Sequence, residues 1–244
     1  MTGLILAGPT AAAVVDPTAS VAGVSQLTLS EQWWQWALSI PNASNPITDT
    51  TGANAGINNN GPVFFLAGNT GGSSTRSFNV PAGRPLFFPV LNGFDVEFKN
   101  DPNCGLACAF AFLDQLNMSG ATNLHATLDG VDLLTFPNYR QRSTQFFTAH
   151  WSNPEPFAFG LPEGDYDVVS DGYWVALDGL APGAHTLVFS GMTPSFTLEV
   201  TDNISAVPEP ETFGLVLLGL LAAVGTRRRV NDRAAVVSIG PARG

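Results

Sequence analysis

Short runs of strand character dominate this sequence between residues 63 and 201. They are rich in Phe, Val, Leu and Thr, and Gly, Pro and Asn bound them, which is typical of β-strands separated by turns. Asp129-Gly130 stands between two of the runs and predicts a two-residue hairpin turn. Because the runs do not alternate with helices, we expect a mainly β fold, namely a β-sandwich of jelly-roll or immunoglobulin-like kind. The expected strands are 63–67, 75–80, 86–91, 123–128, 131–136, 144–150, 166–169, 173–177, 184–190 and 195–201.

Two short helices are expected beside the strands. Thr28 and Glu31 fit a capping box and Pro41 stops a helix, so the first helix is predicted over 29–39. The second is predicted over 103–117.

Three tryptophans lie on the first predicted helix, at positions 33, 34 and 36. Trp33 and Trp36 fall on its apolar face and Trp34 widens that face. Such a cluster favours packing in the core, and the alternative is an exposed platform that stacks on sugar rings.

The charge balance limits the possible partners. The chain has 244 residues, 45% of them hydrophobic and only 12% charged, with 20 acidic and 10 basic side chains. That composition suits an exported β protein with a folded core. Half of the basic residues lie beyond residue 226, so the body is strongly acidic, and we expect no nucleic-acid partner because like charges repel.

Cys104 and Cys108 are the two cysteines of the chain. On a helix their spacing places the Cα atoms roughly 6 Å apart, within the range of a disulfide. A local disulfide in an oxidising compartment and a pair of small buried thiols are both compatible with the sequence. We predict no metal site here, because no second close pair of ligands accompanies them.

Residues 1–13 contain a short apolar run and three consecutive alanines, but no basic residue precedes them. They are similar to the second half of a signal peptide, and we expect the true start codon to lie upstream.

The C-terminal segment changes character after residue 204. Val207, Pro208, Glu209 and Pro210 come first, and their two prolines predict an extended, exposed segment. The stretch 213–225 follows without any charge and predicts a helix in lipid. Arg227, Arg228 and Arg229 come next, and such a basic cluster is retained on the cytoplasmic side of a membrane.

The apolar stretch is short for a membrane span. Its 13 residues span about 20 Å as a helix, against about 30 Å of hydrocarbon. Flanking threonines and arginines that snorkel narrow this gap. The alternative is an ordinary terminal core helix, which would have no reason to carry the proline motif and the arginines at its two ends.

This order of motif, apolar stretch and arginines resembles the PEP-CTERM sorting signal of bacteria that carry an exosortase. The resemblance covers 207–229, with Pro208, Glu209 and Pro210 on the motif and Arg227–Arg229 on the basic cluster. It implies that a membrane-embedded, cysteine transpeptidase-like exosortase reads the motif, and that the protein reaches the cell surface or extracellular matrix. The chain continues for 15 residues past Arg229, which such signals usually do not.

The body gives weaker indications of chemistry. No nucleophile elbow, metalloprotease helix or phosphate-binding loop occurs in a fitting context, so we predict no catalytic residues. Calcium remains a possible ligand in two places. One group consists of Asp165, Asp167 and Asp171, and the other of Asp95, Glu97 and Asp101.

The sequence therefore predicts four segments. These are a partial signal-like segment 1–13, a mainly β ectodomain 14–204, a sorting signal 205–229 with a transmembrane helix 213–225, and a cytoplasmic tail 230–244. The predicted function is an exported, exosortase-sorted surface or matrix protein without catalytic activity. Alternatives are a carbohydrate- or calcium-binding module and an extracellular hydrolase. Expected partners are the exosortase, the membrane and an extracellular polysaccharide.

Overall fold

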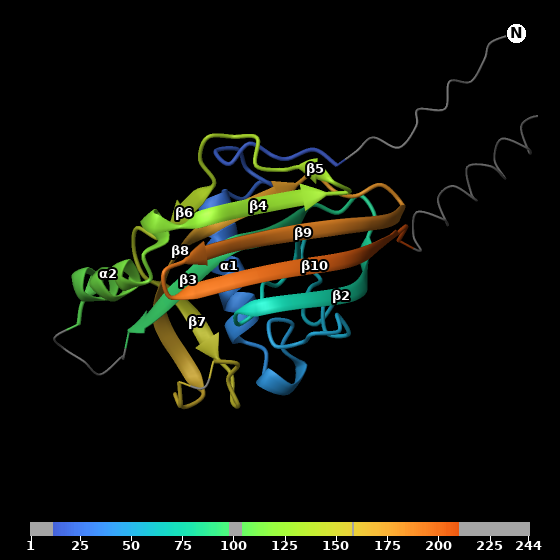
Figure 1. The fold of residues 1–244 in the computed structure, drawn as a ribbon. Helices are drawn as coiled ribbons and strands as arrows, with labels where there is room; N and C mark the ends of the chain where they lie inside the picture. Colours follow the sequence, from blue (N-terminus) through green and yellow to red (C-terminus); the bar gives the residue numbers. More distant parts are fainter. Residues whose placement is uncertain (1–11, 98–103, 158, 210–244) are drawn as a thin grey trace, which may run out of the picture. The chain divides into compact units, whose positions relative to one another are not determined.

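The computed structural model describes residues 12–97, 104–157 and 159–209. Two five-stranded sheets make up most of this part of the chain (Figure 1). The first has the order β1-β3-β8-β6, with β7 also paired to β8, and the second has the order β2-β10-β9-β4-β5. The prediction of a mainly β protein with few helices is confirmed. The elements are α1 (Gln26–Leu38), a 3-10 turn (Asn42–Ser44), β1 (Phe64–Phe65), β2 (Gly72–Pro81), β3 (Leu86–Glu97), α2 (Leu106–Gln115), a second 3-10 turn (Met118–Gly120), β4 (Thr122–Leu128), β5 (Val131–Asp132), β6 (Arg140–Arg142), β7 (Phe147–Trp151), β8 (Gly164–Leu177), β9 (Gly183–Thr193) and β10 (Phe196–Val207).

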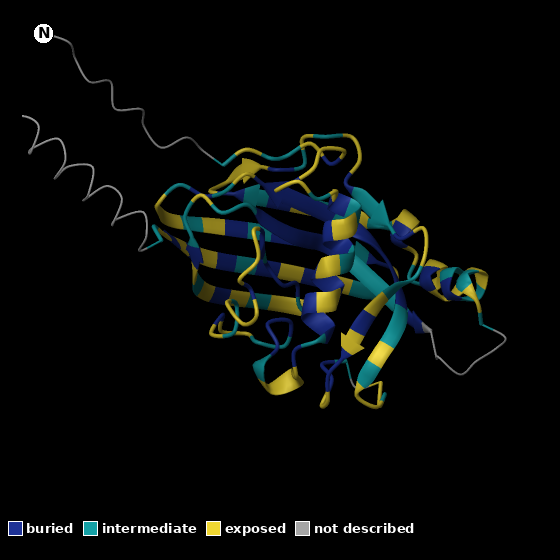
Figure 2. Cartoon of the chain, turned by 180° about the vertical axis from the view of Figure 1, so that it is seen from behind, coloured by how far each residue is buried: buried dark blue, intermediate teal, exposed yellow. Residues whose placement is uncertain are grey.

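The sheets pack face to face around a shared apolar core. Phe88 of β3 and Phe189 of β9 meet in it with ring centroids 5.2 Å apart. Buried and exposed residues alternate along the strands of the second sheet, so its other face is polar and accessible (Figure 2). Two neighbouring pairs, β1 with β3 and β2 with β10, run parallel.

Helix α1 covers the outer face of the first sheet. Trp33 of α1 lies 5.4 Å from Trp174 of β8, and Trp174 stacks on Phe87 of β3 with centroids 5.2 Å apart. Phe87 and Phe88 are consecutive, so the strand directs one ring to the helix and the other to the sheet interface. The centre of the first sheet, where β3 and β8 pair, is therefore buried on both faces.

The predicted start of the first helix is wrong by three residues. Ser25 caps α1, and its hydroxyl accepts a hydrogen bond from the backbone N–H of Thr28 at 3.1 Å. Thr28 therefore lies inside the first turn, and its backbone N–H donates to the cap residue. The capping-box prediction had placed Thr28 at the cap, with its side chain as the acceptor. The predicted end is close to the observed one, because Ser39 is the C-cap.

The strands predicted over 166–169 and 173–177 form one continuous strand, β8. The sequence between them, Ser170-Asp171-Gly172, is typical of a turn. Here Gly172 is extended and packs closely against β3. A side chain at this position would place its Cβ atom 2.6 Å from the Asn92 Cβ, which is too close, so glycine fits where other residues would not. Sequence patterning also missed β6, whose three residues pair with this same part of β8.

The hairpin prediction at Asp129-Gly130 is confirmed. Both residues have positive φ, 53° and 81°, and they join β4 to β5. The second predicted helix is confirmed as α2, which is shorter than expected at both ends.

Candidate functional site

The last strand of the domain runs into the predicted sorting motif. β10 has a partner on each side, since Val207 pairs with Pro81 of β2 and Ala206 pairs with Gly183 of β9. The carbonyl of Val207 accepts a hydrogen bond from the N–H of Ala82 at 2.8 Å. Val207 is therefore part of the sheet, and the chain divides into compact units after this residue. The predicted end of the ectodomain at 204 is three residues too early, because β2 supplies partners as far as Val207.

Pro208 and Glu209 follow outside any regular element, and both are partly exposed. Proline has no N–H group, so Pro208 cannot donate to a further step of the ladder. Pro210, the apolar stretch 213–225, Arg227–Arg229 and the tail 230–244 lie outside the described residues. Within the ranges that are described, no helix is both long and apolar enough to cross a membrane.

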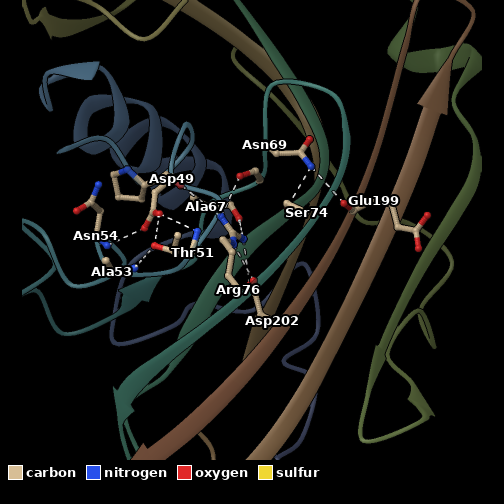
Figure 3. Close-up of polar contacts among 12 residues, drawn as sticks. Asp49, Thr51, Ala53, Asn54, Ala67, Asn69, Ser74, Arg76, Glu199 and Asp202 are labelled. Carbon is tan, nitrogen blue, oxygen red and sulfur yellow. Dashed lines mark hydrogen bonds and ion pairs between the residues drawn. The ribbon is translucent and has the colours of Figure 1, made fainter. Parts of the chain in front are cut away.

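A buried ion pair fastens β10 to β2 (Figure 3). Arg76 donates from Nε and Nη2 to the two carboxylate oxygens of Asp202, at 2.8 and 3.1 Å. The two side chains are 4% and 0% exposed. Burial raises the pKa of Asp202, and Arg76 opposes that effect. The same guanidinium donates to the backbone carbonyls of Pro46, Ala67 and Gly68, so it also holds the loop before β2.

The tryptophans of α1 are core residues. Trp33, Trp34 and Trp36 are 1%, 3% and 7% exposed. The indole N–H of Trp33 donates to the carbonyl of Leu66, and that of Trp36 to the carbonyl of Ile57, each at 2.9 Å. The packing interpretation is confirmed, and these side chains do not form an exposed sugar platform.

Cys104 and Cys108 are bonded to each other as a disulfide, with Cα atoms 5.0 Å apart. The bridge encloses the start of α2, whose N-cap is Gly105. The sequence was compatible with a local disulfide or with two buried thiols, and the structure contains the disulfide.

The first group of calcium candidates does not lie in a loop. Asp165, Asp167 and Asp171 are all on β8, an extended strand that spreads them along its length. Asp171 is 1% exposed and accepts a hydrogen bond from Nε of Arg140 at 2.8 Å, while Arg142 lies 3.4 Å away. The hydrogen bond to Asp171 raises the pKa of Arg140. The structure therefore places this group on a strand and not in a loop, with Asp171 paired to Arg140, and calcium binding by it stays a prediction.

The second group is only partly described. Asp95 lies on β3, and burial raises the pKa of its carboxyl. Glu97 is the last residue of that strand, and Asp101 falls outside the described residues. Calcium binding by this group stays a prediction. Among the described residues, no three His, Cys, Asp or Glu side chains gather as a metal site would require.

Sequence reasoning missed a second Pro-Glu-Pro triplet inside the domain, at Pro154, Glu155 and Pro156. Glu155 is 8% exposed, and its carboxylate accepts hydrogen bonds from the N–H groups of Phe157 at 2.6 Å and Gly160 at 3.0 Å. The repeated tripeptide was visible in the sequence. Its role as a loop organiser was not, because that depends on which backbone groups surround the carboxylate.

Comparison with known proteins identifies the C-terminal segment. Residues 206–229 match the PEP-CTERM protein-sorting motif, which confirms the resemblance drawn from the sequence. The chain thus carries the C-terminal signal of exported proteins that an exosortase sorts. No curated protein matches the chain.

Two solved structures show limited similarity. The structure of PbICP-C in complex with falcipain-2 contains a chain that is 13% identical, with 60% of this chain and 100% of that chain covered and a TM-score of 0.23. The solution structure of Amebosin is 10% identical, with 55% and 96% covered and a TM-score of 0.17.

Proposed function

We propose that this chain is a surface or extracellular-matrix protein without catalytic activity, which an exosortase processes at Pro208, Glu209 and Pro210. The stretch 213–225 would hold the intermediate in the inner membrane, and Arg227–Arg229 would keep its end in the cytoplasm. The observation that carries the proposal is the position of the matched segment, 206–229, against the end of β10 at Val207. A processing enzyme could remove everything from Pro208 onward without removing one residue from the sheet.

The proposal of a non-catalytic domain has independent support. Asp171 and Asp202 are fully buried acids, and each is paired with an arginine, so neither carries an uncompensated buried charge. The sugar-binding alternative depended on exposed tryptophans. Those of α1 are buried, so this support is gone. A role in the matrix would then use the outer surface of the domain.

Cell fractionation tests this function. The wild-type chain would be expressed with and without the host's exosortase and detected with an antibody raised against residues 12–207. We expect it in the surface fraction when the exosortase is present and in the membrane fraction when it is absent.

The Glu209→Ala variant should stay in the membrane fraction even with the exosortase. Glu199→Ala is the matched control, since Glu199 is an exposed glutamate on β10 outside the motif, and it should behave as wild type. A chain that is cytosolic in both strains, or distributed alike in both, would overturn the proposal.

A further inference from the structure

An apolar cavity of about 350 Å³ opens where α1, β3 and the start of β10 converge. Trp33 and Trp34 contribute from α1, Phe94 from β3 and Phe196 from β10. Small-molecule sites in proteins have volumes of roughly 300–1,000 Å³ and are lined mainly by apolar and aromatic side chains. The size and composition of the cavity both fall within that description.

The lining carries no formal charge. Its polar side chains are those of Asn69, Thr70 and Asn92, and none of the residues that line it is acidic or basic. Asn69 is occupied, because its amide already bonds to the backbone of Gly72 and Glu199. In a chain with a net charge of −10, an uncharged cavity disfavours ionic ligands, since a buried charge needs a partner.

Two buried donors in the cavity wall are unsatisfied. The indole nitrogen of Trp34 and the amide nitrogen of Asn92 have no hydrogen-bond partner, and both residues line the cavity. Trp34 is 3% exposed. Both nitrogens are closed off from solvent, so the cavity presents an apolar, aromatic surface to a ligand and not these donors.

The loop that carries the internal Pro-Glu-Pro triplet forms the rim of the cavity. Glu155 holds the N–H groups of Phe157 and Gly160, and the rings of Phe157 and Phe159 both line the cavity. Phe159 is 59% exposed, although it stacks on the buried Trp151 with ring centroids 5.8 Å apart. An exposed phenylalanine fixed at the mouth of an apolar cavity provides contact area to an entering ligand.

We propose that this cavity binds a neutral, mainly apolar small molecule, such as an aliphatic alcohol or an aromatic compound. A protein partner fits less well. A stable interface buries about 800 Å² on each side, and Phe159 is the one large hydrophobic residue of this lining that is clearly exposed. The proposal is independent of the sorting function, because every residue of the lining precedes Pro208.

Titration with the neutral fluorophore N-phenyl-1-naphthylamine tests the site. The full chain should bind it saturably, with a fluorescence increase that Phe159→Ser weakens about fivefold in Kd, the equivalent of one aromatic contact of about 1 kcal/mol. Phe112→Ser is the matched control, because Phe112 is 52% exposed on α2 and does not line the cavity. It should leave Kd unchanged, and any binding by the C-terminal segment is common to all three proteins.

Displacement tests the predicted ligand chemistry. Dodecanol should displace the fluorophore at lower concentration than dodecanoate, which has the same chain length and a negative charge. The proposal fails if the wild-type chain shows no saturable binding, if Phe112→Ser weakens binding as much as Phe159→Ser, or if dodecanoate displaces as well as dodecanol.

Discussion

The chain contains the tripeptide Pro-Glu-Pro twice, and the two copies have opposite relations to the fold. In the first copy, Glu155 is buried and satisfies two backbone N–H groups of its own loop. In the second, Pro208 and Glu209 follow the last residue of β10 and are partly exposed. The same three residues therefore organise a loop at one site and lie within the matched sorting segment, 206–229, at the other.

The difference shows that the tripeptide alone does not define a processing site. An enzyme that binds a peptide as an extended strand needs backbone groups that the fold has not used. At Glu155 the surrounding backbone is engaged, whereas the ladder of β10 ends at Val207. The comparison predicts that variants on the folded side lose stability and that variants of the second triplet lose sorting alone.

The largest loss of stability is expected at the ion pair that anchors β10. Asp202→Asn leaves the Arg76 guanidinium buried without its counter-ion, which typically costs about 3–5 kcal/mol. Urea unfolding followed by tryptophan fluorescence measures it, with Asn203→Ser on the exposed face of β10 as the control. An Asp202→Asn variant as stable as Asn203→Ser would contradict the stabilising role of the pair.

A smaller loss is expected in the loop of the first triplet. Glu155→Ala leaves the N–H groups of Phe157 and Gly160 without their acceptor, and we expect a loss of about 2–3 kcal/mol in the free energy of unfolding. Glu163→Ala is the matched control, since the Glu163 side chain is 63% exposed, and it should change stability by less than about 0.5 kcal/mol. Equal effects of the two substitutions would show that the first triplet does not organise its loop.

The free energy of unfolding should depend modestly on pH because of His185 on β9, the strand beside β10. Burial lowers the pKa of His185, but its hydrogen bonds to Asp129 and to the carbonyl of Ala181 outweigh burial, so the net pKa is raised above 6.5. A raised histidine pKa stabilises the fold below the unfolded value, and the contribution disappears as pH rises through the folded value.

Burial raises the pKa of Asp129, but the hydrogen bonds from the Thr186 N–H and from His185 lower it by more. The net pKa is therefore lowered. Its contribution is therefore lost only as pH falls through that lowered value. His185→Gln should cost up to about 1 kcal/mol at pH 6 and less at pH 8. Chemical denaturation at the two pH values measures this, and a cost that grows with pH would refute the assignment.

The smallest effect on stability is expected at the second triplet. Glu209→Ala follows the last strand and should change the free energy of unfolding by less than about 0.5 kcal/mol. The same variant should abolish sorting. A substantial loss of stability would mean that Glu209 belongs to the folded domain, and the contrast between the triplets would disappear.

Patterns that depend on neighbours in sequence could be predicted here. The strand expected over 184–190, the hairpin at Asp129-Gly130 and the apolar face of α1 depend on local signals, and the structure contains all three. The sorting segment was recognisable for a related reason, since its motif, apolar stretch and arginines follow one another directly along the chain.

Features that depend on distant partners could not be predicted. The residues Ser170-Asp171-Gly172 have the composition of a turn. Pairing with β3 and the contact between Asp171 and Arg140 keep them extended instead. The Arg76–Asp202 pair joins residues 126 positions apart, and the cavity assembles side chains from Trp33 to Phe196. Such contacts follow from the register of the sheets, which no local pattern specifies.

The mass of the surface protein tests the central claim most directly. Intact-mass spectrometry would compare wild type, Glu155→Ala and Glu209→Ala from cells with the exosortase, together with wild type from cells without it. We predict that wild type and Glu155→Ala lack 213–229 and end near Pro208–Pro210, and that the other two samples keep the C-terminal segment. Surface protein that retains Arg227–Arg229, or Glu209→Ala protein cut like wild type, would contradict the account.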